Sequence, residues 1–239
     1  MTLPARVAVL VSGGGTNLQA LFDRFHGEPS PAARVELVVA SRAGVGALER
    51  AARAGVEAVV LDVRETGPEA LAARMLEAME RHRIDLVVLA GYLQLVPLAV
   101  VERFRGRMIN IHPALLPGFG GKGMYGLRVH RAVIESGARV SGATVHLVSD
   151  RYDEGAILAQ WPVPVLPGDT PEALAARVLA TEHVLLPACV EALARGEGPP
   201  APPEGPLCFD LAPSAAPAAG SVRATMAAAP FEPGGEAAS

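Results

Sequence analysis

Asn110 and His112 stand two residues apart at the end of an apolar run, in the stretch MINIHPALLP from Met108 to Pro117. Side chains two residues apart on a strand point to the same face of a sheet. Pro113 favours extended geometry at His112. We therefore expect an amide and an imidazole side by side at the exit of a strand. Such a pair can hold a carbonyl oxygen and transfer a proton.

A carboxylate and a second imidazole are candidates to complete this proton-handling site. Asp153 lies in the polar turn DRYDEG, and a carboxylate near His112 would favour the imidazolium and raise the pKa of His112. A charged imidazole beside the Asn110 amide would stabilise an oxyanion. For His146 the residues leave two roles open, a purely structural one and one in which it hydrogen-bonds and fixes a neighbour.

The spacing of the other reactive residues argues against metal or covalent catalysis. The histidine pairs lack close ligand spacing and no acidic cluster accompanies them, so we expect no metal. No serine shows a nucleophile elbow, and neither Cys189 nor Cys208 precedes a helix in a plausible site. Direct group transfer without a covalent intermediate is the simplest interpretation.

A glycine-rich stretch near the N-terminus is a candidate anion site. SGGGTN, at Ser12–Asn17, follows the apolar run VAVLV and precedes a segment with helical spacing. A strand, a glycine-rich turn and a helix direct free backbone N–H groups toward an anion. The stretch lacks both the full dinucleotide fingerprint and the P-loop lysine. A tight turn without a ligand therefore stays open beside a phosphate cradle made by Gly13, Gly14, Gly15, Thr16 and Asn17.

Apolar runs alternate with helical segments through the first half of the chain. The predicted strands are Val7–Val11, Glu36–Ala40, Ala58–Leu61, Asp85–Ala90 and Arg107–Ile111. The order βαβαβαβαβ predicts an α/β fold with a doubly wound, mostly parallel sheet and right-handed crossovers. In such sheets ligands lie beyond the carboxyl ends of strands. The glycine loop, the GYLQLV loop and the Asn110–His112 pair all fall at such ends.

The second half predicts a different strand arrangement and a long final helix. Gly142–Val148 and Ile157–Val165 need no crossover helix, so we expect antiparallel pairing, with the proline-bearing second segment at an edge. Thr170 is expected to cap a helix that runs to about Ala194. The loop Gly118–Leu127 is either a mobile flap over the site or a passive surface loop. Earlier in the chain, Thr66 and Glu69 fit a capping box.

The composition of the chain limits the classes of protein to which it can belong. The chain has 239 residues, of which 50% are hydrophobic and 19% charged, with a net charge of −4. These values suit one compact domain, or two small ones, and argue against a general nucleic-acid binder. The candidate catalytic residues all fall within residues 1–195, which we expect to form the catalytic domain. The cysteines share no metal or redox spacing, and no signal peptide is recognised, so we expect a cytoplasmic location. The apolar stretch Leu86–Val101 is interrupted by polar residues, glycine and proline, so we expect no membrane span. The oligomeric state stays open and is compatible with a homodimer.

The composition changes at Gly196. Nine of the 21 prolines lie in residues 196–239, among alanine, glycine and glutamate. We expect a Pro/Ala-rich disordered tail, because such a composition buries too little apolar surface to fold. Leu207–Leu211 (LCFDL) is the one segment in it that could form a small docking patch.

Five stretches resemble, in this order, those of the phosphoribosylglycinamide formyltransferase family: SGGGTNLQAL, VVLAGYLQLVP, INIHPALLP, SGATVHLVSDRYDEGAILAQ and GDTPEALAARVLATEH. The resemblance covers roughly residues 5–195. It implies a Rossmann-like formyltransferase fold and a step of de novo purine biosynthesis. In that step 10-formyltetrahydrofolate, a co-substrate, gives its formyl group to the amine of glycinamide ribonucleotide through a tetrahedral intermediate. It implies no metal.

The resemblance also implies roles for individual residues. Asn110, His112 and Asp153 match the catalytic residues, Glu182 falls where the family contacts the substrate ribose, and His146 matches a histidine close to the catalytic aspartate. The substrate phosphate would lie on Gly14, Gly15, Thr16 and Asn17. The folate pocket would be formed by Leu93, Gln94, Leu95, Val96, Ser149 and Asp150.

The chain departs from the family pattern in three places. Gln94 stands where some relatives carry arginine, GGKGMYGL is longer than the loop of several relatives, and the tail has no counterpart. A cis peptide is expected at Leu116–Pro117.

Three rival functions share parts of this pattern. Formyltetrahydrofolate hydrolase delivers the formyl group to water, but its relatives carry a regulatory domain ahead of the catalytic one, for which a first strand near Val7 leaves no room. Methionyl-tRNA formyltransferase adds a domain that binds tRNA, whereas this tail is proline-rich and not basic. A non-catalytic nucleotide-binding module on the same sheet would not need Asn110, His112 and Asp153 to come together.

Overall fold

The computed structural model describes residues 3–27 and 32–196. Its strands are β1 (Ala5–Val11), β2 (Ala33–Ala40), β3 (Glu57–Val60), β4 (Leu86–Leu89), β5 (Met108–His112), β6 (Val140–Leu147) and β7 (Ile157–Pro164). Its helices are α1 (Thr16–Phe25), α2 (Gly46–Arg53), α3 (Val63–Thr66), α4 (Pro68–Arg81), α5 (Leu98–Arg103), α6 (Leu127–Glu135) and α7 (Pro171–Ala194). The predicted strands are all present, with ends shifted by a few residues.

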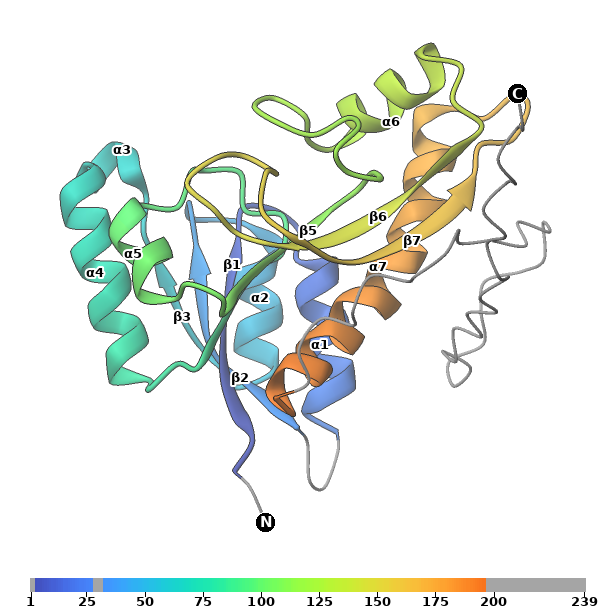
Figure 1. Ribbon diagram of the computed structural model, residues 1–239. Coiled ribbons are helices and arrows are strands. Elements are labelled where there is room, and N and C mark those ends of the chain that lie inside the picture. The colour runs from blue at the N-terminus through green and yellow to red at the C-terminus, as the bar shows by residue number, and fades with distance from the viewer. Residues whose placement is uncertain (1–2, 28–31, 197–239) are drawn as a thin grey trace, which may run out of the picture.

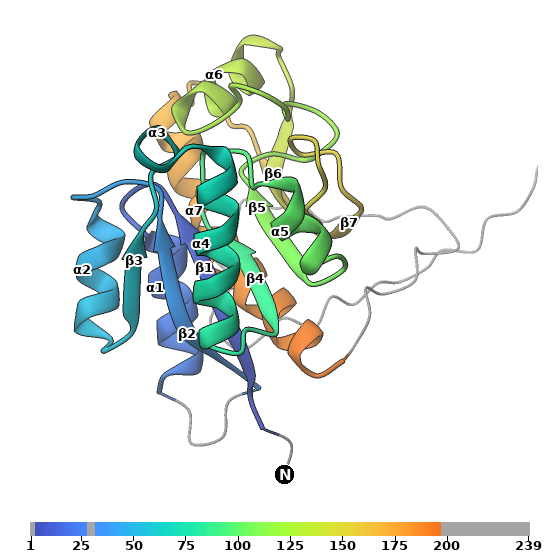
Figure 2. The ribbon, with the colours of Figure 1, turned by 90° about the vertical axis from the view of Figure 1, so that its left-hand side faces the viewer.

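The strands form one seven-stranded sheet in the order β3-β2-β1-β4-β5-β6-β7. The pairs from β3 to β5 are parallel, whereas β5–β6 and β6–β7 are antiparallel. Helices α1, α2 and α7 cover one face, and α3, α4 and α5 cover the other (Figures 1 and 2). The predicted doubly wound, mostly parallel sheet with antiparallel C-terminal strands is confirmed, and β7 is an edge strand as its prolines predicted.

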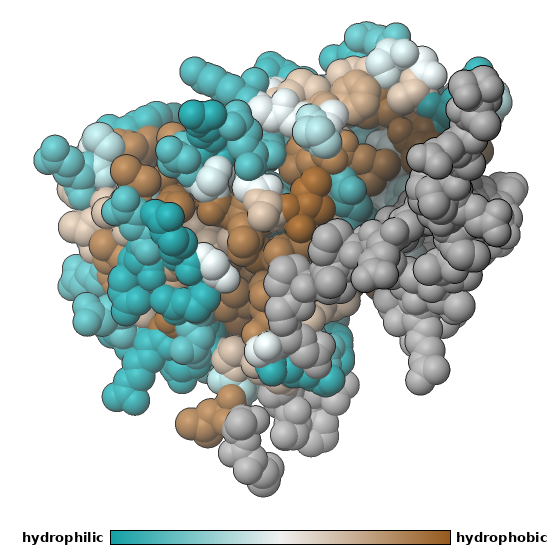
Figure 3. Space-filling model, viewed as in Figure 1, coloured by the Kyte–Doolittle hydropathy of each residue, from teal (hydrophilic) through white to brown (hydrophobic). Residues whose placement is uncertain are grey.

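The sheet separates two hydrophobic cores. Along β1, Val7, Val9 and Val11 pack into the core shared with α1 and α7, whereas Ala8 and Leu10 pack into the core shared with α4 and α5. A strand buried on both faces reads as a continuous apolar run, because neither face can carry polar side chains. On the surface, hydrophobic residues gather at the centre of one face, between the hydrophilic surface around α4 and the region of α6 (Figure 3).

The strand order reverses at β1, whose neighbours are β2 on one side and β4 on the other. The loops that leave β1 and β4 therefore diverge there and open a crevice, the usual ligand site of this architecture. Hydrogen bonds tie the two loops together at their base. The Ser12 N–H donates to the Gly91 carbonyl at 3.1 Å, and the Leu93 N–H donates to the Ser12 hydroxyl oxygen at 2.9 Å.

The capping box predicted at Thr66 and Glu69 is wrong. Thr66 is the last residue of α3, and its hydroxyl donates to the Asp62 carbonyl at 3.0 Å. Gly67 takes the N-cap position of α4, with Pro68 in its first turn. Asp62 is the N-cap of the separate short helix α3, and its carboxylate accepts from the Arg64 N–H. Asp62 and Thr66 are both residue types that commonly cap helices. The sequence pattern alone did not show which of the two does so.

Helix α7 has 24 residues and packs on the sheet beside α1. Thr170 caps it by accepting from the Ala173 N–H at 3.2 Å, as predicted. By length and composition α7 is the one helix in the described residues that could cross a membrane. Leu174, Val178 and Leu186 are fully buried in the core shared with α1, which accounts for its apolar character as a core helix. The Leu116–Pro117 peptide is cis. The predicted tail, residues 196–239, lies outside the described residues apart from Gly196.

Two glycines in the loop after β1, Gly13 and Gly15, differ in the backbone conformation and the space around them. Gly15 has φ +74°, and a Cβ there would lie 2.8 Å from the Ala47 Cβ on α2. Gly13 has no such φ, and a Cβ there would meet nothing within 4 Å. The tight contact between this loop and α2 therefore depends on Gly15 and not on Gly13.

We expect Gly15→Ala to lower the free energy of unfolding by about 1–3 kcal/mol, because α2 must move and the left-handed backbone is strained. Gly13→Ala should be neutral or stabilising by up to about 1 kcal/mol, since it restricts the unfolded chain. Urea denaturation of both variants measures the difference. Equal losses in the two variants would contradict the assigned contact.

Candidate functional site

A cavity of about 590 Å³ opens beyond the carboxyl ends of β1, β4 and β5. Such a volume is typical of small-molecule sites. The loop before α6, the turn after β6 and the middle of α7 complete its walls. Residues from these separate elements line it together, among them Asn17, Asn110, His112, His130, Asp153 and Glu182.

The pairing of β5 with β6 places Asn110 beside His146. The two residues are partners in the antiparallel ladder, so their side chains lie on the same face. The Asn110 Nδ2 donates to His146 Nε2 at 3.0 Å, while His146 Nδ1 bonds the Leu147 carbonyl at 2.8 Å. A carbonyl only accepts, so Nδ1 carries the hydrogen and Nε2 is left to accept from the amide. His146 thus fixes the orientation of Asn110.

Asp153 comes to the same point from the turn between β6 and β7. Its Oδ1 accepts from Asn110 Nδ2 at 3.4 Å, and its Oδ2 accepts from the Gly121 N–H at 2.9 Å. Asp153 has φ +57°, a backbone conformation that is uncommon for residues other than glycine. Its neighbours thus hold a strained turn in place, a feature that concentrates at functional sites.

His112 lies at the centre of this cluster with only 3% of its surface exposed. Its Nε2 is 2.9 Å from the Phe119 carbonyl oxygen, and its Nδ1 is 3.5 Å from Asp153 Oδ2. The carbonyl fixes a hydrogen on Nε2, which leaves Nδ1 facing the carboxylate. The structure therefore brings Asn110, His112 and Asp153 together, as the sequence predicted.

The Asp153 carboxylate acts on the His112 pKa in the expected direction, but burial decides the net direction. Burial lowers the pKa of His112, and this effect outweighs the Asp153 carboxylate and the Phe119 carbonyl, which raise it. Burial raises the pKa of the Asp153 carboxyl, but the neighbouring His146 and His112 and the Gly121 N–H together lower it by more, so that the pKa lies below its usual value. In the free protein the imidazole is thus held closer to neutrality than the sequence suggested.

A second polar pair forms the opposite wall of the cavity. Asn17 Nδ2 donates to Glu182 Oε2 at 2.6 Å, and both side chains are buried, at 8% and 7% exposure. Burial raises the pKa of Glu182, with the Asn17 amide acting in the opposite direction. The Asn17 Oδ1 is buried without a partner among the described residues. This wall therefore holds an acceptor and a carboxylate in reach of a bound molecule.

The glycine loop leads directly into α1. Thr16 and Asn17 are the first residues of the helix, after Gly15 in the left-handed region. Backbone N–H groups in a first helical turn have no partner within the helix and attract anions. Arg50 steadies the loop by donating from Nε to the Gly14 carbonyl at 2.8 Å. Of the predicted phosphate residues, Asn17 lines the cavity, and Thr16 faces a neighbouring groove.

The residues predicted for the folate pocket fall in three places. Leu93 lines the main cavity. A smaller hollow of about 50 Å³, which shares Asn110 and Asp153 with the main cavity, is lined by Gln94, Leu95, Val96 and Ser149. Asp150 is exposed and lines neither. The structure thus groups five of the six predicted residues around Asn110 and Asp153.

Sequence reasoning missed three groups in or beside the cavity. His130, on the first turn of α6, lines the cavity with 4% exposure, and its Nδ1 is buried without a partner among the described residues. Its position just after the glycine-rich loop was the available signal. The Phe119 carbonyl and the Gly121 N–H contact His112 and Asp153, but backbone groups leave no mark in a sequence. Within residues 3–27 and 32–196, no three His, Cys, Asp or Glu residues cluster to hold a metal.

Comparison with known proteins identifies relatives along most of the chain. Residues 5–190 match the formyl transferase family. The chain is 42% identical over 194 residues to a chloroplastic phosphoribosylglycinamide formyltransferase of Vigna unguiculata, covering 79% of this chain and 60% of that protein. The corresponding protein of Arabidopsis thaliana is 44% identical over 182 residues, which cover 75% of this chain and 62% of that one. This chain spans about three fifths of the length of these curated relatives.

The fold has solved counterparts of similar extent. Glycinamide ribonucleotide transformylase 1 from Symbiobacterium toebii superposes with a TM-score of 0.75 and 43% identity, covering 81% of this chain and 89% of that one.

We expect Asp153→Asn to lower the pKa of His112 further, because the variant removes the negative charge that favours the imidazolium. NMR titration of the His112 ring protons measures the shift. Asp150→Asn, an exposed position in the same turn, is the matched control and should leave the His112 midpoint in place. A His112 midpoint that stays or rises in Asp153→Asn would show that the carboxylate does not act on the ring.

We expect Glu182→Gln to raise the melting temperature at pH 7. The pKa of Glu182 is raised by burial, so its contribution to stability is present below the unfolded value of about 4.3 and is lost as pH rises through the folded value. Glutamine keeps the acceptor for Asn17 and carries no charge. The gain should shrink toward pH 4, and the exposed control Glu135→Gln should change little. Scanning calorimetry across pH tests this, and a variant less stable than wild type at pH 7 contradicts it.

Proposed function

The chain belongs to the formyl transferase family, and on this basis we propose that it transfers the formyl group of 10-formyltetrahydrofolate to the amine of glycinamide ribonucleotide, a step of de novo purine biosynthesis. The observation that carries the proposal is one cavity with two polar walls. The cluster of Asn110, His112 and Asp153 suits a reacting carbonyl, and the Asn17–Glu182 wall beside the start of α1 suits a phosphorylated sugar.

The nucleotide would bind at the α1 side. The first-turn N–H groups of α1 would hold the phosphate, and Gly14, Gly15, Thr16 and Asn17 are the residues we assign to it. Glu182, fixed by Asn17 at 2.6 Å, would accept hydrogen bonds from the ribose hydroxyls. No pocket for a nucleobase is required, because glycinamide ribonucleotide carries a glycinamide group in place of a nucleobase.

The formyl donor would enter from the loop after β4. Leu93, Gln94, Leu95, Val96 and Ser149 surround the hollows next to Asn110, and their backbone N–H and C=O groups suit the polar edge of a pterin ring. Asp150 is exposed, so we assign it at most a contact at the rim. The formyl carbon would then lie between Asn110 and the nucleotide amine.

The reaction would proceed by direct attack of the amine on the formyl carbon. Negative charge develops on the formyl oxygen, and the Asn110 amide and the His112 imidazolium stabilise it. The bond between the formyl carbon and the folate nitrogen then breaks. One proton leaves the attacking amine and one reaches the folate nitrogen, with Asp153 and His112 holding the path between them through a water.

The low pKa of the free His112 is compatible with this scheme. A developing oxyanion beside the ring favours the charged imidazole, as does the Asp153 carboxylate 3.5 Å away. Burial keeps the ring near neutrality before the substrates bind. The ring would therefore take up the proton that leaves the attacking amine as negative charge appears on the formyl oxygen, which is when the imidazolium stabilises the transition state. The proton would then pass through the water to the folate nitrogen.

Further features of the protein remain proposals beside the activity. We propose a cytoplasmic location, small-molecule substrates with no nucleic-acid or membrane partner, and a reaction without metal. A homodimer is compatible with the proposal and is not required by it.

Incubation with 10-formyltetrahydrofolate, with and without glycinamide ribonucleotide, tests the activity. We expect loss of the formyl donor only when the nucleotide is present, with the formylated nucleotide detected by mass spectrometry. Formate release without the nucleotide would favour formyltetrahydrofolate hydrolase. An absence of turnover in both mixtures would favour a non-catalytic nucleotide-binding module.

We expect Asn110→Ala and His112→Ala each to lower kcat by about 10²–10³, the loss of about 2.7–4 kcal/mol typical of a missing oxyanion donor. Circular dichroism should show both variants folded. His82→Ala, at the C-terminal end of α4 and away from the cavity, is the matched histidine control. Near-wild-type turnover in either site variant would refute the assigned role.

A further inference from the structure

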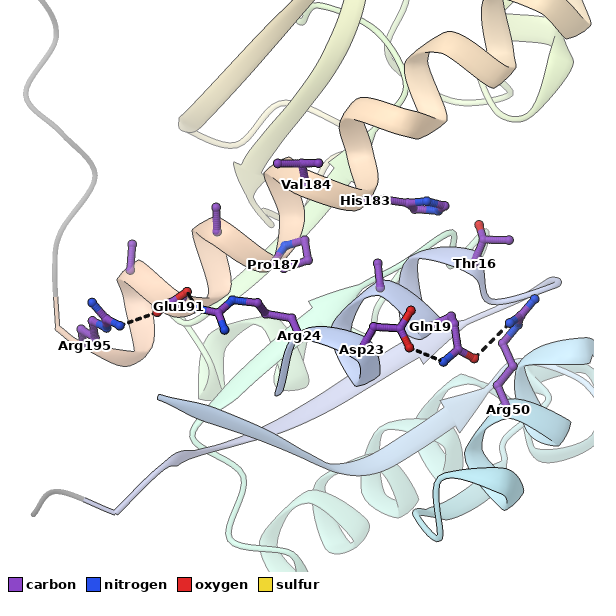
Figure 4. Close-up of a pocket in the computed structure, with 13 residues that line it drawn as sticks. Thr16, Gln19, Asp23, Arg24, Arg50, His183, Val184, Pro187, Glu191 and Arg195 are labelled. Atoms are coloured by element: carbon purple, nitrogen blue, oxygen red, sulfur yellow. Dashed lines mark hydrogen bonds and ion pairs between the residues drawn. The ribbon is translucent and has the colours of Figure 1, made fainter. Parts of the chain in front are cut away.

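A second hollow, of about 870 Å³, lies between α1 and α7 (Figure 4). It reaches Thr16 at one end and shares no lining residue with the cavity of the proposed active site. We call it the α1–α7 groove. Small or apolar side chains line much of it: Ala20 from α1 and Val184, Pro187, Ala188 and Ala192 from α7. Alanines on both helices leave room for the groove between the backbones. None of the proposed reaction steps uses it.

Charged side chains border the groove in a defined pattern. Arg24 on α1 reaches Glu191 on α7 at 2.6 Å, and Arg195 also pairs with Glu191 (Figure 4). At the other end Arg50 donates to the Gln19 side chain at 3.0 Å, and Gln19 donates to Asp23 at 2.8 Å. Three arginines thus face two carboxylates. The rim carries a small excess of positive charge and favours an acidic, partly apolar partner.

The chain itself contains a segment of that chemistry. Leu207, Phe209 and Leu211 alternate with Cys208 and Asp210. In extended backbone this alternation puts three apolar side chains on one face. The stretch from residue 197 to residue 212 contains three acidic residues and no basic one, Glu197, Glu204 and Asp210. Its apolar face matches the groove floor, and its charge matches the rim.

The connection between groove and segment is short. Arg195, which lines the groove, is the residue before Gly196, where the described chain ends. The twelve residue-to-residue steps from Gly196 to Cys208 span up to about 40 Å when extended, whereas the path along α7 from His183 to its C-cap Arg195 spans about 18 Å at the rise of a helix. The segment can therefore return along the whole groove without strain.

A second copy of the chain is a poorer fit to the same surface. In a two-fold dimer a patch faces the same patch of its partner, and two concave grooves do not fill one another. An extended segment with one apolar face does fill a groove. A tethered segment also acts at a high effective concentration, in the millimolar range for a short flexible linker.

From these observations we propose that residues 204–212 of this chain dock in the α1–α7 groove, with Leu207, Phe209 and Leu211 against its alanine floor. The docked segment would cover Ala20 and lie along α1, which begins at the glycine loop. This proposal concerns packing outside the cavity and does not depend on the reaction assigned above.

The natural thiol of Cys208 allows a direct test in the full-length chain. Ala20→Cys places a thiol in the groove, and Ala52→Cys places one on the exposed side of the neighbouring α2. Ala52 is the more exposed of the two positions, so the comparison is biased against the proposal. Cys189 does not compete, because burial raises the pKa of its thiol to about 12. Mild oxidation with oxidised glutathione is followed by digestion and mass spectrometry without reduction.

We expect the intramolecular disulfide to Cys208 to form at least about tenfold faster in Ala20→Cys than in Ala52→Cys, since docking raises the local concentration of Cys208. Adding Phe209→Asp to Ala20→Cys should remove this advantage. Equal rates in the two single variants, or an advantage that survives Phe209→Asp, overturn the proposal. A disulfide between two chains, forming faster at higher protein concentration, assigns the groove to a second copy and also overturns it.

Discussion

The Asp153 carboxylate connects three segments that would otherwise have little reason to meet. It accepts from the Gly121 N–H in the glycine-rich loop and from Asn110 at the end of β5, and it lies 3.5 Å from His112. Asp153 itself is held at φ +57° in the turn after β6. One buried charge thus determines where the loop, the strand end and the turn stand relative to one another. The catalytic geometry we propose exists only while that carboxylate is in place.

Burial acts on both walls of the cavity, and it acts against charge on each. It lowers the pKa of His112 and raises the pKa of Glu182, so both groups are pushed toward their neutral forms. Two neutral groups cost less free energy to bury than two charged ones. The ligand-free site is therefore a compromise in which the fold tolerates two titratable groups whose charged forms the bound substrates would favour, because ribose hydroxyls would donate to Glu182 and an oxyanion would form beside His112.

The parts of this site that were predictable from sequence depend on local periodicity. Residues two apart on a strand share a face, which placed Asn110 beside His112, and strand ends meet at one edge, which brought the glycine loop to them. The pKa direction of His112 was not predictable, because it depends on how many apolar neighbours the tertiary packing supplies. The Phe119 carbonyl was not predictable either, since any residue presents one. Thr66 shows the same limit at short range. Asp62 and Thr66 could each cap a helix, and only the packed structure shows that Asp62 does.

The Asn110 side chain is hydrogen-bonded to one basic and one acidic residue, His146 and Asp153. Its two amide hydrogens point to His146 at 3.0 Å and to Asp153 at 3.4 Å, so none is spare for a bound carbonyl. The Asp153 contact is the longer one and is the one that a formyl oxygen would replace. Asp153 would then lose a donor, and its unneutralised charge would act more strongly on His112. Binding of the carbonyl by Asn110 thus favours protonation of His112, so the two oxyanion donors would form together.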